Sequence, residues 1–304
     1  MIAPLGSVTD HADTGLLLAP NEVQSRPRLL RSLLQDRTAV LGLVIVVTLS
    51  VMVILAPLLS PHDPNVQDVA NRFAPPSRDF PFGTDHLGRD VLSRLLFGGR
   101  LSIGTAVAAT AAISAIGLVL GMLAGYCAGI LDTIISRLIE VVQTVPGFLL
   151  ALAITAVLGT GLRNVAIAVV ITAWATYARV VRGAVLAERG KDYVESARAV
   201  GVSTTRLFRK HLLPNILGPV LVITTLELGV ILLVVSGLSF LGLGVKPPAA
   251  EWGAMLAEGR TYLGRAPQMM FYPGAAIFLM VLGFNLLGDG LRDVLDPRTR
   301  EGRR

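Results

Sequence analysis

Residues 193–215 read YVESARAVGVSTTRLFRKHLLPN, a polar and basic stretch between two long apolar runs. Its charged side chains exclude it from hydrocarbon, where ionised groups are costly. The pattern predicts a short helix over Tyr193–Val200, a sharp turn at Gly201, and a second helix that begins near Ser203 and stops at Pro214. We interpret the stretch as a helix–turn–helix at a membrane surface, and the rest of the chain as the frame that holds it there.

Small residues shape the first of these two helices. Ala197 and Ala199 keep one of its faces thin, while Val194 and Val200 would give it an apolar edge. A thin helix that ends in a tight turn is suited to a groove on a partner protein. An ordinary loop helix, lying on lipid headgroups through its Arg and Lys side chains, is the alternative that these residues leave open.

The composition indicates a membrane protein. Of the 304 residues, 53% are hydrophobic and the mean hydropathy is +0.65. The apolar residues fall in blocks of roughly 20, the length that crosses about 30 Å of hydrocarbon. A β-barrel would instead show alternating strands of about 10 residues. The sequence therefore predicts an all-α integral membrane protein, and its single cysteine, Cys127, excludes a disulfide framework.

Six transmembrane helices are expected within a membrane domain at residues 39–290. They cover about 39–59, 101–129, 134–158, 165–185, 216–241 and 274–287. The other segments are an N-terminal tail at 1–38 that is expected to be partly disordered, outer segments at about 60–100 and 242–273, a polar loop at about 188–214, and a C-terminal tail at 291–304.

Two features inside the spans carry structural predictions. Glycine recurs at every fourth residue of the second span, at Gly117, Gly121, Gly125 and Gly129. This stripe would let a neighbouring helix approach closely, and a sliding or hinge surface is the alternative function. In the third span, Pro146-Gly147 predicts a kink or a break.

The placement of charge predicts the orientation. Six spans put both termini on one side of the membrane, and Lys and Arg favour the cytoplasmic side. The N-terminal tail, the polar loop at 188–214 and the C-terminal tail are rich in these residues. The outer segment at 60–100 also carries Arg, accompanied by Asp, although acids count little in this rule. We therefore expect both termini and the polar loop in the cytoplasm.

No catalytic constellation is evident. The four histidines, His11, His62, His86 and His211, lie in different segments and form no HExxH motif, no metal-ligand spacing and no Cys–His pair. A Walker-type phosphate loop is also missing. We therefore expect a protein that is not an enzyme, with no catalytic, metal-binding or cofactor-binding residue. If energy is consumed, another subunit must supply the nucleotide site.

The polar loop has a specific spacing of Glu195-Ser196-Ala197, three residues, Gly201, nine residues, and His211-Leu212-Leu213-Pro214. It resembles the EAA loop of permease subunits of ATP-binding-cassette importers, where E-A-A, three residues, G, nine residues and I-x-L-P follow one another. Ser196 and His211 depart from that pattern. Two further stretches are similar to the dipeptide/oligopeptide/nickel permease family, in particular to its second permease subunit. They are FGTDHLGRDVLSR at 82–94, and LSFLGLG at 238–244 followed by EWGAM at 251–255. The resemblance covers about residues 39–297.

The resemblance implies a type I importer fold in the bacterial cytoplasmic (inner) membrane. It also implies import of peptides or similar small solutes, with nickel or a metal chelate as the alternative within the family. The expected partners are a homologous permease subunit, two ATPase subunits that hold ATP and Mg²⁺, a periplasmic or lipid-anchored substrate-binding protein, and membrane lipid, but no nucleic acid. The expected ATPase-coupling residues are Glu195, Ser196, Ala197, Gly201, Leu213 and Pro214.

Two other classes of function are distant alternatives. A membrane scaffold or receptor would bind partners without moving solute. A secondary transporter would need ion-coupling sites and usually an internal repeat, and neither is evident in the sequence.

Glu227 lies near the middle of the fifth span, where an ionisable side chain is by default a functional candidate. It would line the translocation path and meet a cationic group of the solute. The alternatives are a hydroxyl cap from Thr224 or Thr225, or a pair with the partner subunit. Val230 and Val234 offer no nitrogen donor to a metal ion, which favours peptides over nickel.

The outer segments hold a second group of candidates. Alternating charges at residues 85–90 suggest internal ion pairs that fix this segment at the outer mouth of the path, and contact with the binding protein is the alternative. The outer-mouth candidates are Asp85, Arg89, Asp90, Glu251 and Trp252. Trp252 and Tyr262 would suit an interfacial depth.

Overall fold

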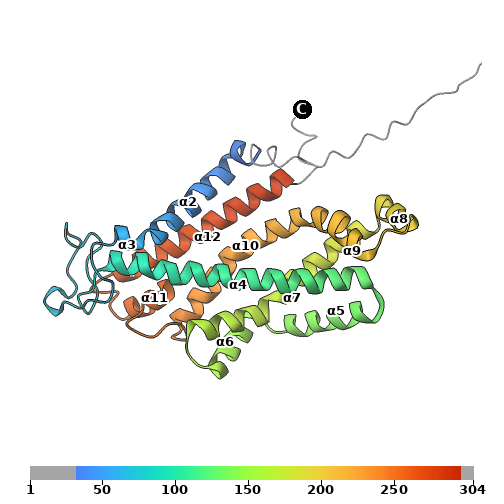
Figure 1. Ribbon diagram of the computed structural model, residues 1–304. Coiled ribbons are helices and arrows are strands. Elements are labelled where there is room, and N and C mark those ends of the chain that lie inside the picture. Colours follow the sequence, from blue (N-terminus) through green and yellow to red (C-terminus); the bar gives the residue numbers. More distant parts are fainter. Residues whose placement is uncertain (1–31, 296–304) are drawn as a thin grey trace, which may run out of the picture.

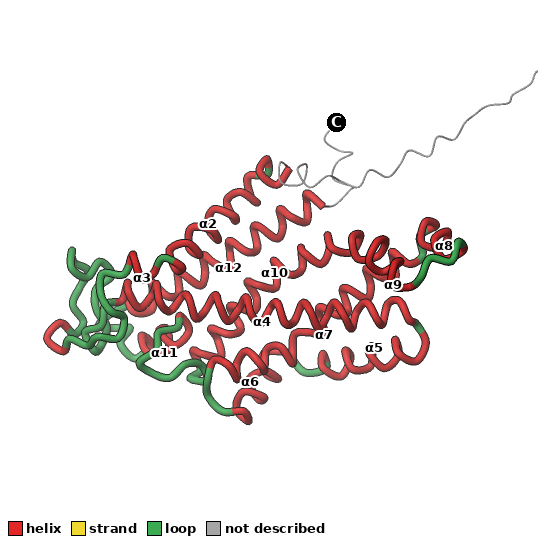
Figure 2. The backbone as a smooth tube through the Cα atoms, in the orientation of Figure 1, coloured by secondary structure: helices red, strands yellow, loops and turns green. Residues whose placement is uncertain are grey.

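The computed structural model describes residues 32–295, so most of the expected N-terminal tail and the last nine residues of the C-terminal tail lie outside the described residues. Over residues 32–295 the chain forms helices and loops, without a strand (Figures 1 and 2). The long loops gather at one end of the helices, around α3 and α11, and α8 and α9 lie at the opposite end. The two groups of candidate residues therefore occupy opposite ends of the protein.

The long helices run between the two ends of the molecule, with α2 and α12 inclined to α4 and α7 (Figure 1), and α6 is bent away from α5. The helices are α2 (Arg37–Ile54), α3 (Ala56–Leu59), α4 (Val91–Cys127), α5 (Gly129–Gln143), α6 (Gly147–Leu158), α7 (Leu162–Arg189), α8 (Asp192–Ala199), α9 (Thr204–Leu207), α10 (Leu213–Phe240), α11 (Trp252–Arg260) and α12 (Gln268–Leu295), with a 3₁₀ turn at Val69–Asn71 and a π-helix at Phe208–Leu212.

The predicted membrane spans are present in the part of the chain that the structure describes. Five helical segments are long and apolar enough to cross a membrane, namely α2, α4, α7, the continuous segment Phe208–Phe240, and α12. The pair α5 and α6, which meet at an angle of 84°, makes a sixth span when the two helices are counted as one broken span. Pro146 directly precedes α6, so the predicted break is confirmed. Proline restricts its predecessor and cannot donate the helical hydrogen bond, which explains the position of the break.

The glycine stripe of α4 packs against α7. A Cβ atom on Gly117 would lie 2.7 Å from Tyr177, one on Gly121 would lie 2.6 Å from the carbonyl oxygen of Ala178, and one on Gly125 would lie 2.8 Å from Val185. Only glycine allows these two backbones to approach so closely. The prediction was wrong for Gly129, which begins α5 with φ +66° and has no neighbour within 4 Å of its Cβ position.

Helix α12 packs between α2 and α10. On one side, Gly290 of α12 lies against Ala39 of α2. On the other side, Gly288 lies against Leu226 of α10 and Gly218 of α10 lies near Leu295. Residue numbers rise along α10 as they fall along α12, so α10 and α12 are antiparallel neighbours.

The expected helix end at Pro214 was wrong. The chain passes from α9 through the π-helix into α10, and Pro214 occupies the first turn of α10. Pro214 directly follows the π-helix, where the N–H of Leu213 donates to the oxygen of Phe208, and this wider turn accommodates a residue without an N–H inside a continuous helical path. The second helix of the polar loop is therefore continuous with the fifth span, so a displacement of the loop acts directly on α10.

Candidate functional site

Local sequence signals explain α8 and the turn that ends it. Asp192 and Glu195 lie in the first turn and Arg198 in the last, where their charges complement the helix dipole. After the helix, the N–H of Gly201 donates to the oxygen of Arg198 at 2.9 Å, and the N–H of Val202 donates to the oxygen of Ala197 at 3.1 Å. This hydrogen-bond pair is a Schellman motif, and it requires the positive φ that Gly201 adopts, +76°.

The two faces of α8 have different environments. Val194 and Ala197 are buried and pack with Leu207 and Leu212 in a small apolar cluster. Glu195, Ser196 and Ala199 are exposed, and Val200 is 81% exposed. The expected apolar edge of Val194 and Val200 is therefore split, since one valine points into the loop and the other points away from it.

The six predicted coupling residues divide in the same way. Glu195, Ser196, Gly201 and Pro214 are exposed, Leu213 is half-buried against the main core, and Ala197 is buried. Exposed positions are open to a partner, whereas Ala197 fixes α8 onto the loop. A role for these residues in coupling stays a prediction, and their geometry assigns contact to some and support to others.

A polar network closes the base of the loop. The Tyr193 hydroxyl donates to Glu188 Oε1 at 2.5 Å and accepts from Asn215 Nδ2 at 2.9 Å. Lys191 Nζ lies 2.6 Å from Glu188 Oε2. Burial and the bond to Glu188 raise the pKa of Tyr193 to about 12, so the hydroxyl keeps its proton at physiological pH. The network joins the end of α7 to the start of α10.

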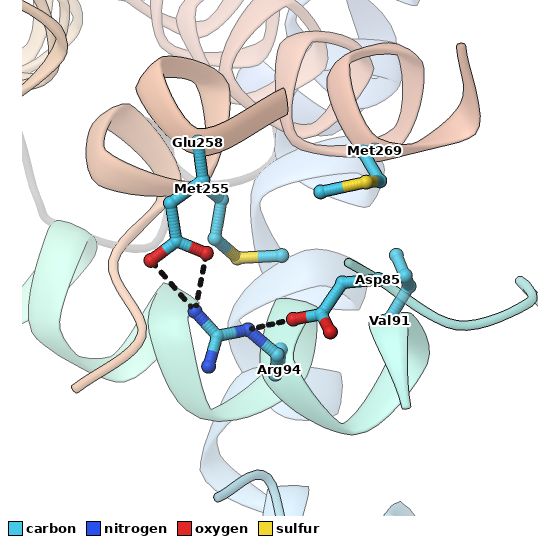
Figure 3. A pocket seen from close by; sticks show the side chains of 6 residues that line it. All are labelled: Asp85, Val91, Arg94, Met255, Glu258 and Met269. Atoms are coloured by element: carbon cyan, nitrogen blue, oxygen red, sulfur yellow. Dashed lines mark hydrogen bonds and ion pairs between the residues drawn. The ribbon is translucent and has the colours of Figure 1, made fainter. Parts of the chain in front are cut away.

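Four charged side chains form the outer cluster, defined here as Asp85, Arg89, Arg94 and Glu258. Arg89 Nε lies 2.6 Å from Asp85 Oδ2 and its Nη2 lies 2.8 Å from Glu258 Oε2. Arg94 lies between the same two carboxylates, 3.1 Å from Glu258 and 3.6 Å from Asp85 (Figure 3). Both guanidinium groups are almost fully buried, and the four charges balance. The cluster joins the outer segment at 60–100 to α11.

The other outer-mouth candidates are also buried and bonded inside the protein. Asp90 caps the start of α4 by accepting from the N–H of Ser93 at 2.9 Å. Glu251 caps α11 by accepting from the N–H groups of Gly253 and Ala254, and it accepts from Ser102 Oγ of α4 at 2.9 Å. Trp252 is 1% exposed and donates to the oxygen of Leu95, so its ring packs inside the protein, and its expected interfacial depth stays a prediction. These contacts favour internal pairing over contact with a binding protein.

Asp85, His86 and Glu258 present three possible metal-ligand atoms within 4.8 Å of one another. Burial lowers the pKa of His86, which favours its neutral form. Arg89 and Arg94 already occupy both carboxylates, so a divalent cation would have to displace two buried guanidinium groups. The donor set alone therefore does not make this cluster a cation site.

Glu227 is half-buried in α10. The two hydroxyls that the alternative interpretation offered as caps are engaged elsewhere. Thr224 Oγ1 donates to the oxygen of Val220 and bonds the hydroxyl of Tyr177, and Thr225 Oγ1 donates to the oxygen of Leu221. The alternative that a threonine hydroxyl caps Glu227 therefore loses its support. Two interpretations of Glu227 remain, namely that it lines the translocation path and that it pairs with a partner subunit.

The chain was compared with known proteins. Residues 117–301 match the binding-protein-dependent transport system inner membrane component, and residues 28–76 match the N-terminal transmembrane domain of oligopeptide transport permease C. The dipeptide transport system permease protein DppC of Alkalihalophilus pseudofirmus is 38% identical over 89% of both chains. The nickel transport system permease protein NikC of Escherichia coli is 41% identical over 84% of this chain and 93% of its own. The oligopeptide transport system permease protein OppC of Bacillus subtilis is 40% identical over 88% of this chain and 87% of its own.

The chain belongs to this family of permease subunits. It is a multi-pass component of a bacterial inner-membrane importer driven by ATP, with the type I permease fold. Partners that bind substrate and partners that hydrolyse ATP are general features of such systems. The relatives are permeases rather than ATPases, which agrees with the expectation that this chain is not an enzyme.

Several residues of this permease escaped the sequence analysis because their partners are distant in the chain. Glu258 bonds Arg94 across 164 positions, Asp132 of α5 bonds Arg182 of α7 across 50, and Asn215 bonds Tyr193 across 22. One signal was available for Glu258, because it follows Glu251 by seven residues and so lies on the same helical face. No comparable local pattern marks the other pairs.

Proposed function

We propose that this permease forms half of the translocation path for peptides or similar small solutes, and that α8 docks on a separate ATPase subunit. The observation that carries the docking proposal is the division of α8 into two faces. Its buried face is fastened by Val194 and Ala197, while Glu195 and Ser196 are exposed beside the Gly201 turn. An exposed short helix on a rigid support can enter a groove without rearranging its own loop.

Gly201 supports the same proposal. A Cβ at this position would meet nothing within 4 Å, so the protein itself has room for a larger residue. Glycine is required there by its φ of +76°. The open space beyond the turn lets a partner surface approach the backbone closely.

The proposed complex contains a homologous permease subunit, two ATPase subunits and a periplasmic or lipid-anchored binding protein. ATP and Mg²⁺ would bind in the ATPase subunits, and this chain would hold no cofactor. ATP-driven closure of the ATPases would move the coupling loop, residues 188–214, and shift the path between inward-open and outward-open packings.

The docking test replaces Glu195 by Ala in the assembled complex and measures ATP hydrolysis stimulated by the binding protein. We expect stimulation to fall by about tenfold, because a hydrogen bond to a charged group contributes about 1.5–3 kcal/mol. Glu140→Ala is the matched control, since it removes another exposed carboxylate, paired with Arg137 at 2.8 Å, outside the coupling loop. Normal assembly and stimulation in both Glu195→Ala and Gly201→Val complexes would overturn the docking role.

Glu227 is proposed to line the path together with polar groups of α12. Gly288 contacts Leu226 where the two antiparallel helices meet. Glu227 follows Leu226 and Asp289 follows Gly288, and each successive residue of a helix is rotated by about 100° about the helix axis. Because the two helices are antiparallel, this rotation points Glu227 and Asp289 to the same side of the helix pair. Asp289 and Asn285 are exposed. Carboxylates on this side are poorly suited to lipid, which supports an aqueous or protein-covered face.

The alternative substrate is nickel or a metal chelate, favoured by the similarity to the nickel permease protein of Escherichia coli. The two substrates are distinguished with the purified binding protein, by thermal shift against a dipeptide mixture and against Ni²⁺ with and without histidine. In the complex, Glu227→Gln should lower uptake of the accepted solute, with Thr225→Val as a control that removes a hydroxyl bonded only to its own helix. Equal uptake in both variants would exclude Glu227 from the path.

A further inference from the structure

The aromatic ring of Tyr126, in the last turn of α4, contacts three separate parts of the coupling loop and its base. Its centroid lies 4.4 Å from that of Phe208 in the π-helix. The guanidinium carbon of Arg198 in α8 lies 5.0 Å from the ring centroid, and that of Arg189 at the end of α7 lies 5.9 Å from it. Both distances are within the range of cation–π attraction.

The backbone of Tyr126 is held at the same place. Arg189 Nη1 donates to the carbonyl oxygen of Tyr126 at 2.9 Å, so a cation satisfies a terminal carbonyl of α4 where the helix dipole is negative. The chain then reverses through Ala128 and Gly129, both with positive φ. One guanidinium group therefore fixes the ring and the end of the helix together.

Tyr126 also completes the small apolar cluster of the loop. It is the α4 side chain that packs against Val194, Ala197, Leu207 and Leu212. The tyrosine hydroxyl makes no hydrogen bond among the described residues of the coupling loop, so the ring rather than the hydroxyl makes the connection. The loop is thus joined to α4 through an aromatic contact as well as to α7 and α10 through the chain itself.

We propose that Tyr126 is a positioning residue that passes movement of the coupling loop to α4. The inference rests on the proposed docking of α8 to an ATPase. Helix α4 has 37 residues, a length of about 55 Å, and runs from the loop to the outer segments. At its outer end Arg94 bonds Glu258 and Ser102 bonds Glu251, both from the α11 segment. Displacement of one end of α4 therefore acts on the outer segment at the other end.

The test uses Cys127, the single cysteine of the chain, which is exposed and adjacent to Tyr126. A nitroxide label on Cys127, in the complex assembled with cysteine-free partners in nanodiscs, reports movement of the α4 end by electron paramagnetic resonance. The spectrum is compared without nucleotide and with ATP plus vanadate. We expect a nucleotide-dependent change in the wild type and in Tyr126→Phe, which keeps the ring.

Tyr126→Leu and Arg198→Gln should reduce that spectral change by about fivefold, the scale of a lost cation–π contact, while ATP hydrolysis stays within about twofold of the wild type. A wild-type spectral change in both variants, or no change in the wild type, would overturn the proposal. If Tyr126→Leu fails to assemble, Arg198→Gln decides alone, because it leaves the apolar cluster intact.

Glu195→Ala separates this inference from the docking proposal on which it rests. If that variant and Gly201→Val both keep the nucleotide-dependent spectrum and the stimulated ATP hydrolysis, docking through α8 fails. If Glu195→Ala loses the spectral change while Tyr126→Leu and Arg198→Gln keep it, docking stands and the role of Tyr126 fails.

Discussion

The close contact of α4 with α7 gives a sharp quantitative prediction for Gly121→Ala. The added Cβ would lie 2.6 Å from the oxygen of Ala178 and 2.7 Å from Val181 Cβ, against an ordinary contact of at least 3.4 Å. The two helices must therefore separate by up to about 0.8 Å, or strain locally, at a cost of about 1–3 kcal/mol. Replacing glycine by alanine inside a helix returns about 0.5–1 kcal/mol. A net loss of about 1–2 kcal/mol is expected.

Gly104→Ala is the matched control, because Gly104 lies in the same helix and a Cβ there would meet nothing within 4 Å. This variant has the helix-propensity gain without the clash, so it should be as stable as the wild type or slightly more stable. Both variants are measured by the midpoint of thermal aggregation of the purified permease, with size-exclusion chromatography as the readout. Gly121→Ala should shift that midpoint downward by a few degrees relative to Gly104→Ala.

A Gly121→Ala midpoint equal to that of Gly104→Ala would refute the reasoning. It would mean that α4 and α7 separate without cost, so their contact would not be the rigid unit that the stripe of three glycines indicates. Gly121→Ser extends the test, since its larger side chain should lower the midpoint at least as much as alanine.

Three further predictions concern polar and charged side chains. Arg94→Met should destabilise the permease by about 2–3 kcal/mol, somewhat less than a fully broken buried pair because Arg89 still bonds Glu258. Thermal unfolding checks this value. The double variant with Arg94→Met and Glu258→Met should be destabilised less than Arg94→Met alone. In Tyr193→Phe, loss of the bond to the charged Glu188 and of the bond from Asn215 should cost about 1.5–3 kcal/mol. Because burial and the bond to Glu188 raise the Tyr193 pKa to about 12, its stabilisation is complete below pH 10 and is lost as the pH rises through 12. Wild type and Tyr193→Phe should therefore show equal phenolate absorbance at pH 10. Asp289→Asn should lower solute uptake without changing the unfolding midpoint, since this side chain is exposed.

The helix–turn–helix of the coupling loop could be predicted because its determinants are local. The charges of α8 and the glycine after it are neighbours in sequence, and the Schellman bonds connect residues no more than five positions apart. The six hydrophobic blocks and the break before Pro146 are local signals of the same kind. Local signals specify where helices begin and turn, and they were read correctly at these places.

The second half of the loop shows why proline was misread. Pro214 is compatible with the first turn of a helix as well as with a helix end. The choice depends on Phe208–Leu212, where the chain adopts a π-helix and continues into α10. Such wider turns have no reliable sequence signature and often occur at functional sites. Leu207 and Leu212 pack under α8, and this tertiary contact explains why the chain stays helical from α9 into α10.

The faces of the helices and the long-range partners of the charges could not be predicted. Val194 and Val200 have the same chemistry, yet one is buried and the other is 81% exposed, because only the position of α4 and of the π-helix distinguishes them. Likewise, Asp85 and Glu258 meet the same two arginines, Arg89 and Arg94, although Glu258 is distant from all three in the sequence. Long-range contacts of this kind follow from the assembled fold rather than from spacing along the chain.

The distribution of close and polar contacts indicates which parts of the permease move together. Glycines allow α4 and α7 to pack backbone against backbone, and the same is true of α12 with α2. Between the α4–α7 pair and α10, by contrast, Tyr177 connects through its hydroxyl to the oxygen of Val220 and to Thr224. A hydrogen bond can exchange partners during a displacement, whereas interlocked backbones must first separate. We therefore infer that α4 and α7 move as one body against α10 and α12. The ring of Tyr126 lies at the end of the first body, and the helix that follows the coupling loop begins the second, so a push on the loop acts between the two.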